Sequence, residues 1–315
     1  MTSTEARPLA DPEPASPTEA ASASGFGDHP LLGMALMLAG IMVFSAMDGL
    51  SKYLTQGYSP VEIAWVRYVV LLICLVPAVV AAGPSRALAT PNPGLQIVRG
   101  LGMLGSTLAF ILALASMPIA DATVIGFLSP LMVAAASMPM LGERVGMQRW
   151  LAVLAGFVGV LVVVQPGTAS FRWTALYAVL AAVSWALAFV LTRQARASDT
   201  SLVMLGYTGL VGTAITTLAL PFVWVWPSPV DWLVMLAAAL CYTVAQWLIV
   251  LALRFASAAV VAPFSYSQLI WASLIGAAFF GTTPDLATVV GSAIIIASGL
   301  FVWHHERRTA RRSPH

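Results

Sequence analysis

Asp48 and Lys52 lie four residues apart near the end of a long apolar run that begins at Leu31. A spacing of four places two side chains on one face of a helix. A charged residue near the centre of a bilayer costs about 2.5–3.5 kcal/mol on insertion scales, so it usually faces a wet cavity or a partner. Lys52 is close enough to the end of the run to reach the interface, and Asp48 is one turn deeper. The pair is either a structural ion pair or a gating pair at a cavity mouth.

Three other charged residues stand in or beside apolar runs. Glu62 and Arg67 are five residues apart, so they do not share a helix face well, and we expect each to pair with another helix. Arg67 is as compatible with structural pairing as with function. Glu143 lies in a short loop, where it either caps a helix or takes part in transport directly. The candidate gating or coupling residues are therefore Asp48, Lys52, Arg67 and Glu143. Protons are possible partners, carried by Asp48, Glu62, Asp121 or Glu143.

Aromatic, amide and hydroxyl side chains near the middle of apolar runs are candidates for binding a small molecule. A buried amide needs a hydrogen-bond partner, which can be a protein group, a water or a ligand. Two prolines, Pro130 and Pro263, interrupt such runs and free carbonyl groups that can line a cavity. For any single aromatic residue, ordinary helix packing is the alternative. The candidate substrate-binding residues are Trp185, Phe189, Gln246, Tyr266, Gln268 and Ser129.

The sequence lacks the motifs of several classes of enzyme and binding site. The sequence contains no phosphate-binding glycine loop, no Ser/His/Asp set and no HExxH pair. The four histidines stand near the chain ends, and both cysteines fall within apolar runs, so neither a metal site nor a disulfide framework is indicated. We expect no enzymatic activity, no cofactor and no metal.

The elements that position these residues follow from the composition. The chain has 315 residues, 59% hydrophobic and 9% charged, with a mean hydropathy of +0.89. Soluble domains carry about 25% charged residues. The apolar segments are about 20 residues long, as in membrane-spanning helices, whereas barrel strands alternate over about 10 residues. The sequence predicts an all-α integral membrane protein, and a net charge of +2 gives no reason to expect nucleic acid as a partner.

Ten spans are predicted, separated by Pro- and Gly-rich breaks. Residues 1–28, rich in Ala, Pro, Ser and Thr, are expected to be a disordered cytoplasmic tail, and 304–315 a basic cytoplasmic tail. The spans are 31–54, 60–82, 94–115, 121–140, 149–166, 173–193, 200–222, 230–253, 257–280 and 284–303.

Basic residues give the orientation. With the N-terminus inside, the cytoplasmic face collects twelve Lys and Arg residues and the outer face two, and Arg67 within the second span completes the total of 15. Because cytoplasmic loops are enriched in these residues, both termini are predicted to be cytoplasmic. The outer pair is Lys52 and Arg172. The inner set is Arg7, Arg86, Arg99, Arg144, Arg149, Arg193, Arg196, Arg254, Arg307, Arg308, Arg311 and Arg312.

The two halves of the chain resemble each other. The segment 111–132 aligns with 248–269, 44–52 with 185–193 and 154–161 with 294–301, at offsets between about 137 and 141 residues. Five spans are an odd number, so the second half must insert with the opposite orientation. Inverted repeats of this kind mark many secondary transporters. The predicted repeats are 31–166 and 173–303, with small residues such as Gly206, Gly209 and Gly212 packing helices closely.

The segments ALASMPIADATVIGFLSPLM and LGERVGMQRWLAVLAGFVGVLVVVQPG resemble the first EamA-type domain of the drug/metabolite transporter superfamily, and ALRFASAAVVAPFSYSQLIWASLIG resembles the second. The resemblance covers about residues 31–303 and is closest to the YddG group of aromatic amino-acid exporters. It implies ten helices around a central cavity. One departure is that Thr282 stands in the second half where Glu143 stands in the first, so a symmetric pair of glutamates is missing.

From this resemblance we expect a secondary transporter of the bacterial inner membrane that exports aromatic or other neutral amino acids by alternating access and works as a monomer. An apolar cavity with aromatics and few polar groups suits such a ligand. One alternative is the same fold exporting a nucleoside, a vitamin or a cationic drug. A remote alternative is a membrane-embedded transferase, which would need an acidic or metal-binding loop cluster that the short loops do not show.

Overall fold

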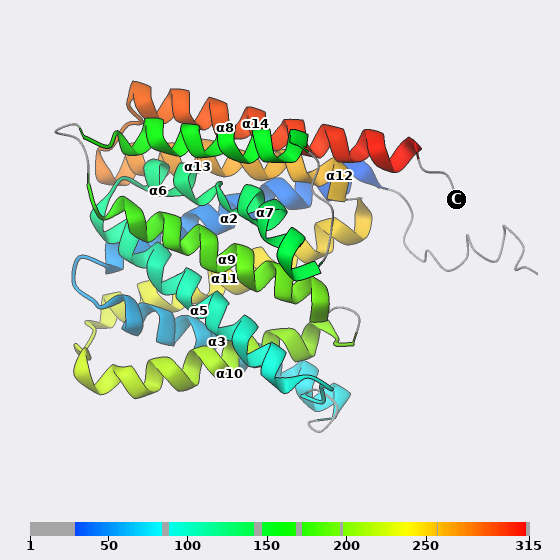
Figure 1. Cartoon of the computed structure of the whole chain (residues 1–315). Coiled ribbons are helices and arrows are strands. Elements are labelled where there is room, and N and C mark those ends of the chain that lie inside the picture. The colour runs from blue at the N-terminus through cyan, green and yellow to red at the C-terminus, as the bar shows by residue number, and fades with distance from the viewer. Residues whose placement is uncertain are drawn as a thin grey trace, which may run out of the picture.

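The computed structural model describes residues 29–83, 88–141, 147–167, 172–195, 198–256 and 258–312, and every regular element in these ranges is helical (Figure 1). Six helices are long and apolar enough to cross a membrane: Pro30–Leu54, Pro60–Ala82, Pro93–Ser116, Ala175–Ala195, Ser201–Phe222 and Pro229–Phe255. Shorter apolar helical stretches cover Ile119–Val133, Trp150–Val164 and Leu286–Phe301. The predicted all-helical membrane protein is confirmed. The predicted N-terminal tail at 1–28 lies outside the described residues.

The unbroken helices follow the predicted spans closely. They are α2 (Pro30–Leu54), α3 (Pro60–Ala82), α5 (Pro93–Ser116), α8 (Met147–Val164), α9 (Ala175–Ala195), α10 (Ser201–Ala219), α11 (Pro229–Phe255) and α14 (Leu286–Arg312). A short 3-10 turn, η1 (Leu220–Phe222), extends α10. The last helix differs from the prediction, because it continues to Arg312 through the segment expected to be a tail. Arg and Ala are good helix formers, so this basic stretch has no local reason to stop.

Two predicted spans are broken in the middle. Residues 121–140 fall on α6 (Ile119–Gly126) and α7 (Ser129–Leu141), with the break just before Pro130. Residues 257–280 fall on α12 (Ala258–Val261), the 3-10 helix η2 (Ala262–Tyr266) and α13 (Ser267–Phe280), with Pro263 inside η2. Proline removes a backbone donor and clashes with the preceding turn, which explains both interruptions.

Side-chain caps and prolines set where helices begin. The hydroxyl of Ser59 accepts a hydrogen bond from the Val61 N–H at 3.3 Å, and that of Ser228 accepts one from the Asp231 N–H at 3.1 Å. Each of these caps is followed directly by a proline, whose fixed φ suits the first helical position. These two breaks between apolar segments therefore contain the N-caps at which the next helices begin.

The helices pack in pairs that join the two halves of the chain. α2 packs against α11, α5 against α9, α3 against α10 and α8 against α14, and Figure 1 shows α8 and α14 side by side along one edge. α2 begins and α14 ends at the same end of the bundle. We call the opposite end, where α2 and α5 finish and α6 and α14 begin, the Lys52 end.

Two glycines allow the close contact between α10 and α3. A Cβ atom on Gly212 of α10 would lie 2.6 Å from the ring of Tyr68 on α3, and one on Gly209 would lie 2.6 Å from Leu72. Contacts below 3.0 Å force a neighbour to move, so glycine at these positions lets the two helices lie close together. The predicted role in helix packing is confirmed for Gly209 and Gly212.

Candidate functional site

Asp48 lies in the second half of α2, six residues before its end at Leu54, with only 1% of its surface exposed. The amide of Gln268 on α13 donates to its Oδ2 at 3.3 Å. Its Oδ1 is buried and has no hydrogen-bond partner in the described part of the chain. Burying a polar group without a partner is costly, so such an atom points to a proton, a water or a ligand group.

Arg67 of α3 reaches the same turn of α2. Its Nη2 donates to the hydroxyl of Ser51 at 3.0 Å, and its guanidinium lies 5.4 Å from the ring centroid of Tyr242 on α11. Its Nε is buried without a partner among the described residues. A cation over an aromatic face is favourable where water is excluded. Arg67 therefore links α2, α3 and α11 beside Asp48.

Lys52 binds the end of α5 from the last turn of α2. Its Nζ donates to the carbonyl oxygens of Leu114 and Met117 at 2.7 Å each and lies 5.6 Å from the ring centroid of Phe280. The carbonyls belong to the C-terminal turn of α5, where a cation satisfies unpaired acceptors and the helix dipole. Lys52 thus joins α2 to α5 instead of pairing with Asp48. We call this contact the Lys52 latch.

The predicted aromatic residues form separate pairs. Trp185 and Phe189 on α9 stack with ring centroids 4.9 Å apart and planes 19° apart, and Phe189 is 38% exposed. Tyr266 in η2 lies 5.1 Å from Phe127, which stands in the break between α6 and α7. Stacked or tilted aromatic pairs offer flat apolar faces to a ring-shaped ligand.

The predicted polar residues lie at the helix breaks and on α11. Ser129 donates to the carbonyl of Gly126 at 2.7 Å and so caps the break before α7. Gln246 lies within hydrogen-bonding reach of Tyr242. Glu62 accepts from the Val225 N–H at 3.3 Å at the start of α3, and its Oε1 has no described partner.

The structure brings some of the predicted residues together and leaves others apart. Asp48 and Gln268 touch directly, and Arg67 binds the helix that carries Asp48. Trp185 and Phe189 touch each other, on a helix that packs against α5, α6 and α7. Glu143 lies outside the described residues.

Sequence reasoning missed several partners. Arg67 contacts Ser51 and Tyr242. Residues with hydroxyl groups are common in apolar helices, so their presence in the sequence did not identify them as partners of Arg67. Tyr242 stands four residues before Gln246, so a same-face rule applied to that amide would have found it. The carbonyl groups that hold Lys52 are backbone atoms, which no sequence pattern marks.

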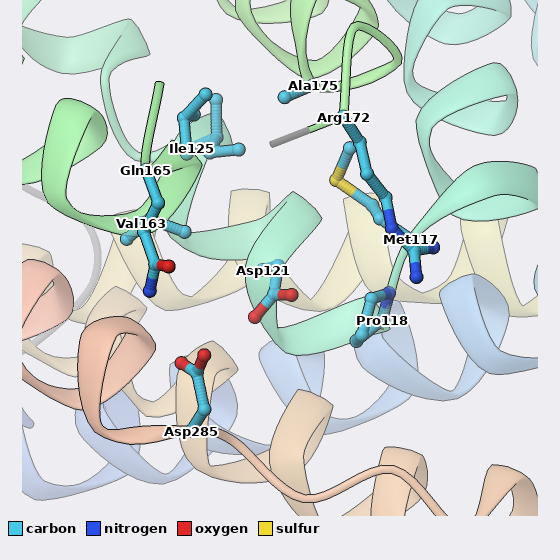
Figure 2. Close-up of a pocket in the computed structure, with 10 residues that line it drawn as sticks. Met117, Pro118, Asp121, Ile125, Val163, Gln165, Arg172, Ala175 and Asp285 are labelled. Atoms are coloured by element: carbon cyan, nitrogen blue, oxygen red, sulfur yellow. The ribbon is translucent and has the colours of Figure 1, made fainter. Parts of the chain in front are cut away.

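A cavity of about 380 Å³ opens at the Lys52 end (Figure 2). It was not predicted, because its walls come from four separate segments of the chain. The lining includes Met117, Asp121, Gln165, Arg172 and Asp285. Among the residues that the structure describes, no group of three or more His, Cys, Asp or Glu side chains is placed to hold a metal ion.

Comparison with known proteins gives one consistent result. The model of the EamA-like transporter family matches residues 31–165 and again 172–303. The S-adenosylmethionine uptake transporter of Rickettsia prowazekii is 28% identical over 279 residues, which cover 89% of this chain and 95% of that protein. The riboflavin transporter of Vibrio cholerae is 31% identical over 290 residues, which cover 90% and 97%.

Two more distant similarities agree with these. The pseudopaline exporter CntI of Pseudomonas aeruginosa is 27% identical over 271 residues, covering 84% of this chain and 94% of that protein. A solved protein structure has a TM-score of 0.62 and 21% identity, and the match covers 88% of this chain and 98% of that one. The second similarity concerns the fold alone.

Proposed function

The chain belongs to the EamA-like transporter family, and from that membership we propose that it is a secondary transporter that imports a vitamin- or nucleoside-like metabolite. Members of this family named here are multi-pass membrane transporters of small molecules, not enzymes. To this family membership, the proposal adds three features: the class of substrate, the direction of transport and the alternating-access mechanism. It replaces the expected amino-acid export, because none of the named relatives is called an amino-acid exporter. The closer resemblance to the YddG group is not confirmed.

The similarity to the S-adenosylmethionine and riboflavin transporters along nearly the whole chain carries this proposal. Both compounds contain a fused heteroaromatic ring, which binds well against aromatic side chains. S-Adenosylmethionine also carries an amino-acid group, so the expected amino-acid substrate shares part of its chemistry. The exporter among the relatives shows that direction varies between similar proteins, and direction must be measured.

We propose ten membrane crossings arranged as two inverted repeats, 31–166 and 173–303, in a bacterial inner membrane. The packing supports this arrangement. If the halves are exchanged, the contact of α2 with α11 becomes that of α9 with α5, and the contact of α2 with α13 becomes that of α9 with α7. The contacts of α3 with α10 and of α8 with α14 map onto themselves. Two repeats related by a two-fold axis produce this exchange, and an odd number of crossings in each repeat gives the second repeat the opposite orientation.

The proposed orientation places both termini in the cytoplasm and the Lys52 end outside. The distribution of Lys and Arg supports this orientation, because most of them belong to segments predicted at the opposite end of the bundle, and cytoplasmic segments are enriched in these residues. That α2 begins and α14 ends at one end agrees with an even number of crossings. We propose that the monomer is the working unit.

For the substrate site, we propose Trp185, Phe189, Gln246, Tyr266, Gln268 and Ser129. The stacked pair on α9 and the tilted pair at the two helix breaks supply aromatic faces for a ring system. The broken helices expose backbone groups that can bind polar parts of the ligand. Gln268 connects this set to Asp48.

For gating and coupling, we propose Asp48, Lys52 and Arg67. The Lys52 latch holds the outer end shut in this conformation, and opening requires its two hydrogen bonds to break. Asp48 and Arg67 each retain a buried atom without a described partner, so both can change partners when helices move. A role for Glu143 rests on the sequence alone.

Transport into proteoliposomes tests the proposed function. Purified protein would be reconstituted and given labelled S-adenosylmethionine, riboflavin, uridine, phenylalanine and threonine, with and without a pH gradient. We expect uptake of at least one of the first three above protein-free liposomes. If phenylalanine or threonine alone moves, amino-acid transport is restored as the function. If folded protein moves none of the five, the proposed substrate class is wrong.

A further inference from the structure

The cavity at the Lys52 end stands apart from the proposed substrate residues. It is formed by the end of α5, the start of α6, the end of α8, the residue Arg172 before α9 and Asp285 before α14. None of the six proposed substrate-binding residues lines it. Its volume of about 380 Å³ is within the range of cavities that hold small metabolites.

Two carboxylates meet on one wall of this cavity. Thr288, in the first turn of α14, holds them together, because its hydroxyl donates to Asp121 Oδ1 at 2.6 Å and its N–H donates to Asp285 Oδ1 at 2.7 Å. Figure 2 shows the two carboxylates pointing toward one another, with Gln165 nearby. Like charges held this close make a strong site for a positively charged group.

A positive side chain stands on the opposite wall. Arg172 Nη1 donates to the Ser116 carbonyl at 3.0 Å, and Figure 2 shows its guanidinium beside Met117 and Pro118, away from Asp285. A guanidinium has five N–H donors in a planar fork that suits a carboxylate. The cavity therefore carries both negative and positive side chains, and Met117, Ile125 and Val163 are part of its apolar lining.

We propose that this cavity is an entry site for a zwitterion that carries an organic cation. The cationic group binds between Asp121 and Asp285, and the carboxylate binds Arg172. The inference rests on the proposed transport function and on the Lys52 end facing outside. It deepens that function, because it selects a charged ligand like S-adenosylmethionine over an uncharged one like riboflavin.

The entry site adjoins the Lys52 latch. Met117 lines the cavity, and its carbonyl oxygen accepts one of the two hydrogen bonds from Lys52. A ligand held there therefore lies beside the contact that must open before it can pass inward. The pathway runs from the entry site, past the latch, to the aromatic residues deeper in the bundle.

Binding by the full-length protein in nanodiscs tests the site. The probes are S-adenosylmethionine, its decarboxylated analogue and riboflavin, measured by calorimetry at neutral pH. Because the attraction between a carboxylate and the cationic group of the ligand is lost, Asp121→Asn and Asp285→Asn should each weaken S-adenosylmethionine binding by about 10-fold or more. Arg172→Gln should weaken S-adenosylmethionine binding and leave the decarboxylated analogue unchanged. Riboflavin binding should change in none of these variants.

Asp231→Asn is the matched control. Asp231 is also a carboxylate in the first turn of a helix that begins at the Lys52 end, but it accepts from Tyr58 at 2.8 Å and Ser228 at 2.6 Å and lies outside the cavity. Its substitution removes the same charge and should leave all three affinities within about two-fold of the unaltered protein, since no ligand contact is lost.

Several results would overturn the entry site. They are unchanged S-adenosylmethionine affinity in Asp121→Asn and Asp285→Asn, an equal loss in Asp231→Asn, or displacement of the probe by Ca²⁺ or Mg²⁺ at matched ionic strength. The transport assay separates this proposal from the proposed function. Protein that transports riboflavin but does not bind S-adenosylmethionine retains the function and refutes the site. Protein that binds S-adenosylmethionine as described but transports nothing retains the binding site, and it refutes both the function and the role of the site as an entry site.

Discussion

If the Lys52 latch holds its end of the bundle shut, as proposed, then replacing Lys52 with methionine should open that end. The substitution keeps an unbranched apolar stem and removes both 2.7 Å hydrogen bonds to the end of α5. Hydrogen bonds that involve a charged group contribute about 1.5–3 kcal/mol each. Because Lys52 is only half buried, the lower figure applies, and the two bonds together give about 3 kcal/mol in favour of the closed form.

This energy predicts a large shift in population. Every 1.4 kcal/mol changes an equilibrium about tenfold, so losing about 3 kcal/mol changes the ratio of closed to open forms by about 100-fold. A protein that is about 99% closed at this end would become about equally closed and open. The cation-π contact with Phe280 is lost as well, which acts in the same direction.

Distances between spin labels can measure the shift. Labels would be placed at Gln56, just beyond α2, and at Ala115, near the end of α5, both of which are exposed. The background would lack the two native cysteines, Cys74 and Cys241. Lys52→Met should add a second, longer distance to the distribution. Lys52→Arg keeps the charge and the donors and should retain the single short distance.

The opposite result is equally clear. If Lys52→Met gives the same distance distribution as the unaltered protein in a folded sample, the latch does not hold the end closed. If Lys52→Arg opens the end as much as Lys52→Met, the positive charge and its donors are not what closes it. Either outcome would remove Lys52 from the gating mechanism.

Four further substitutions test other parts of the structure. Asp48→Asn should retain substrate exchange but lose any stimulation by a pH gradient, because an amide cannot take up a proton; unchanged stimulation in proteoliposomes refutes a coupling role. Phe189→Ala should weaken binding of a heteroaromatic substrate by about tenfold, since an aromatic pair contributes about 0.5–1.5 kcal/mol beyond its buried area, and titration calorimetry would show this. Gly212→Ala should cost about 1–3 kcal/mol by overpacking, whereas Gly57→Ala, with open space around it, should leave the melting temperature nearly unchanged. A hydrogen bond from a backbone N–H of α14 holds the pKa of Asp285 below its usual range. The ionised carboxylate therefore stabilises the folded protein at pH values above its unfolded pKa, and this stabilisation is lost as the pH falls through the folded pKa. The difference in melting temperature between Asp285→Ala and the unaltered protein should be constant from about pH 5 to 8 and shrink below about pH 4.

The helices could be predicted because their lengths and ends are local properties. Continuous apolar runs, prolines at first turns and caps such as Ser59 fix most boundaries within a few residues. The breaks at Pro130 and Pro263 were expected for the same reason. The extension of α14 to Arg312 was not expected, because a charged segment outside the membrane can be either helix or tail.

The candidate site was only partly predictable. Asp48, Lys52 and Arg67 were visible in the sequence because charges are rare in apolar runs. Their partners were not, because the helix spacing that suggested an Asp48–Lys52 pair says nothing about the carbonyl groups of α5 that Lys52 binds instead. The cavity could not be found either, since Asp121 and Asp285 are 164 positions apart in the sequence and meet only through Thr288.

Counterflow in proteoliposomes is the most direct test of the central claim, that this protein carries a heteroaromatic metabolite by alternating access. Vesicles would be loaded with excess unlabelled S-adenosylmethionine or riboflavin and diluted into a trace of the same labelled compound, with no pH gradient. A carrier that alternates between two faces should accumulate label transiently above its equilibrium level, for at least one of the two compounds. Label that only approaches equilibrium, at a rate that internal substrate does not change, would contradict the claim.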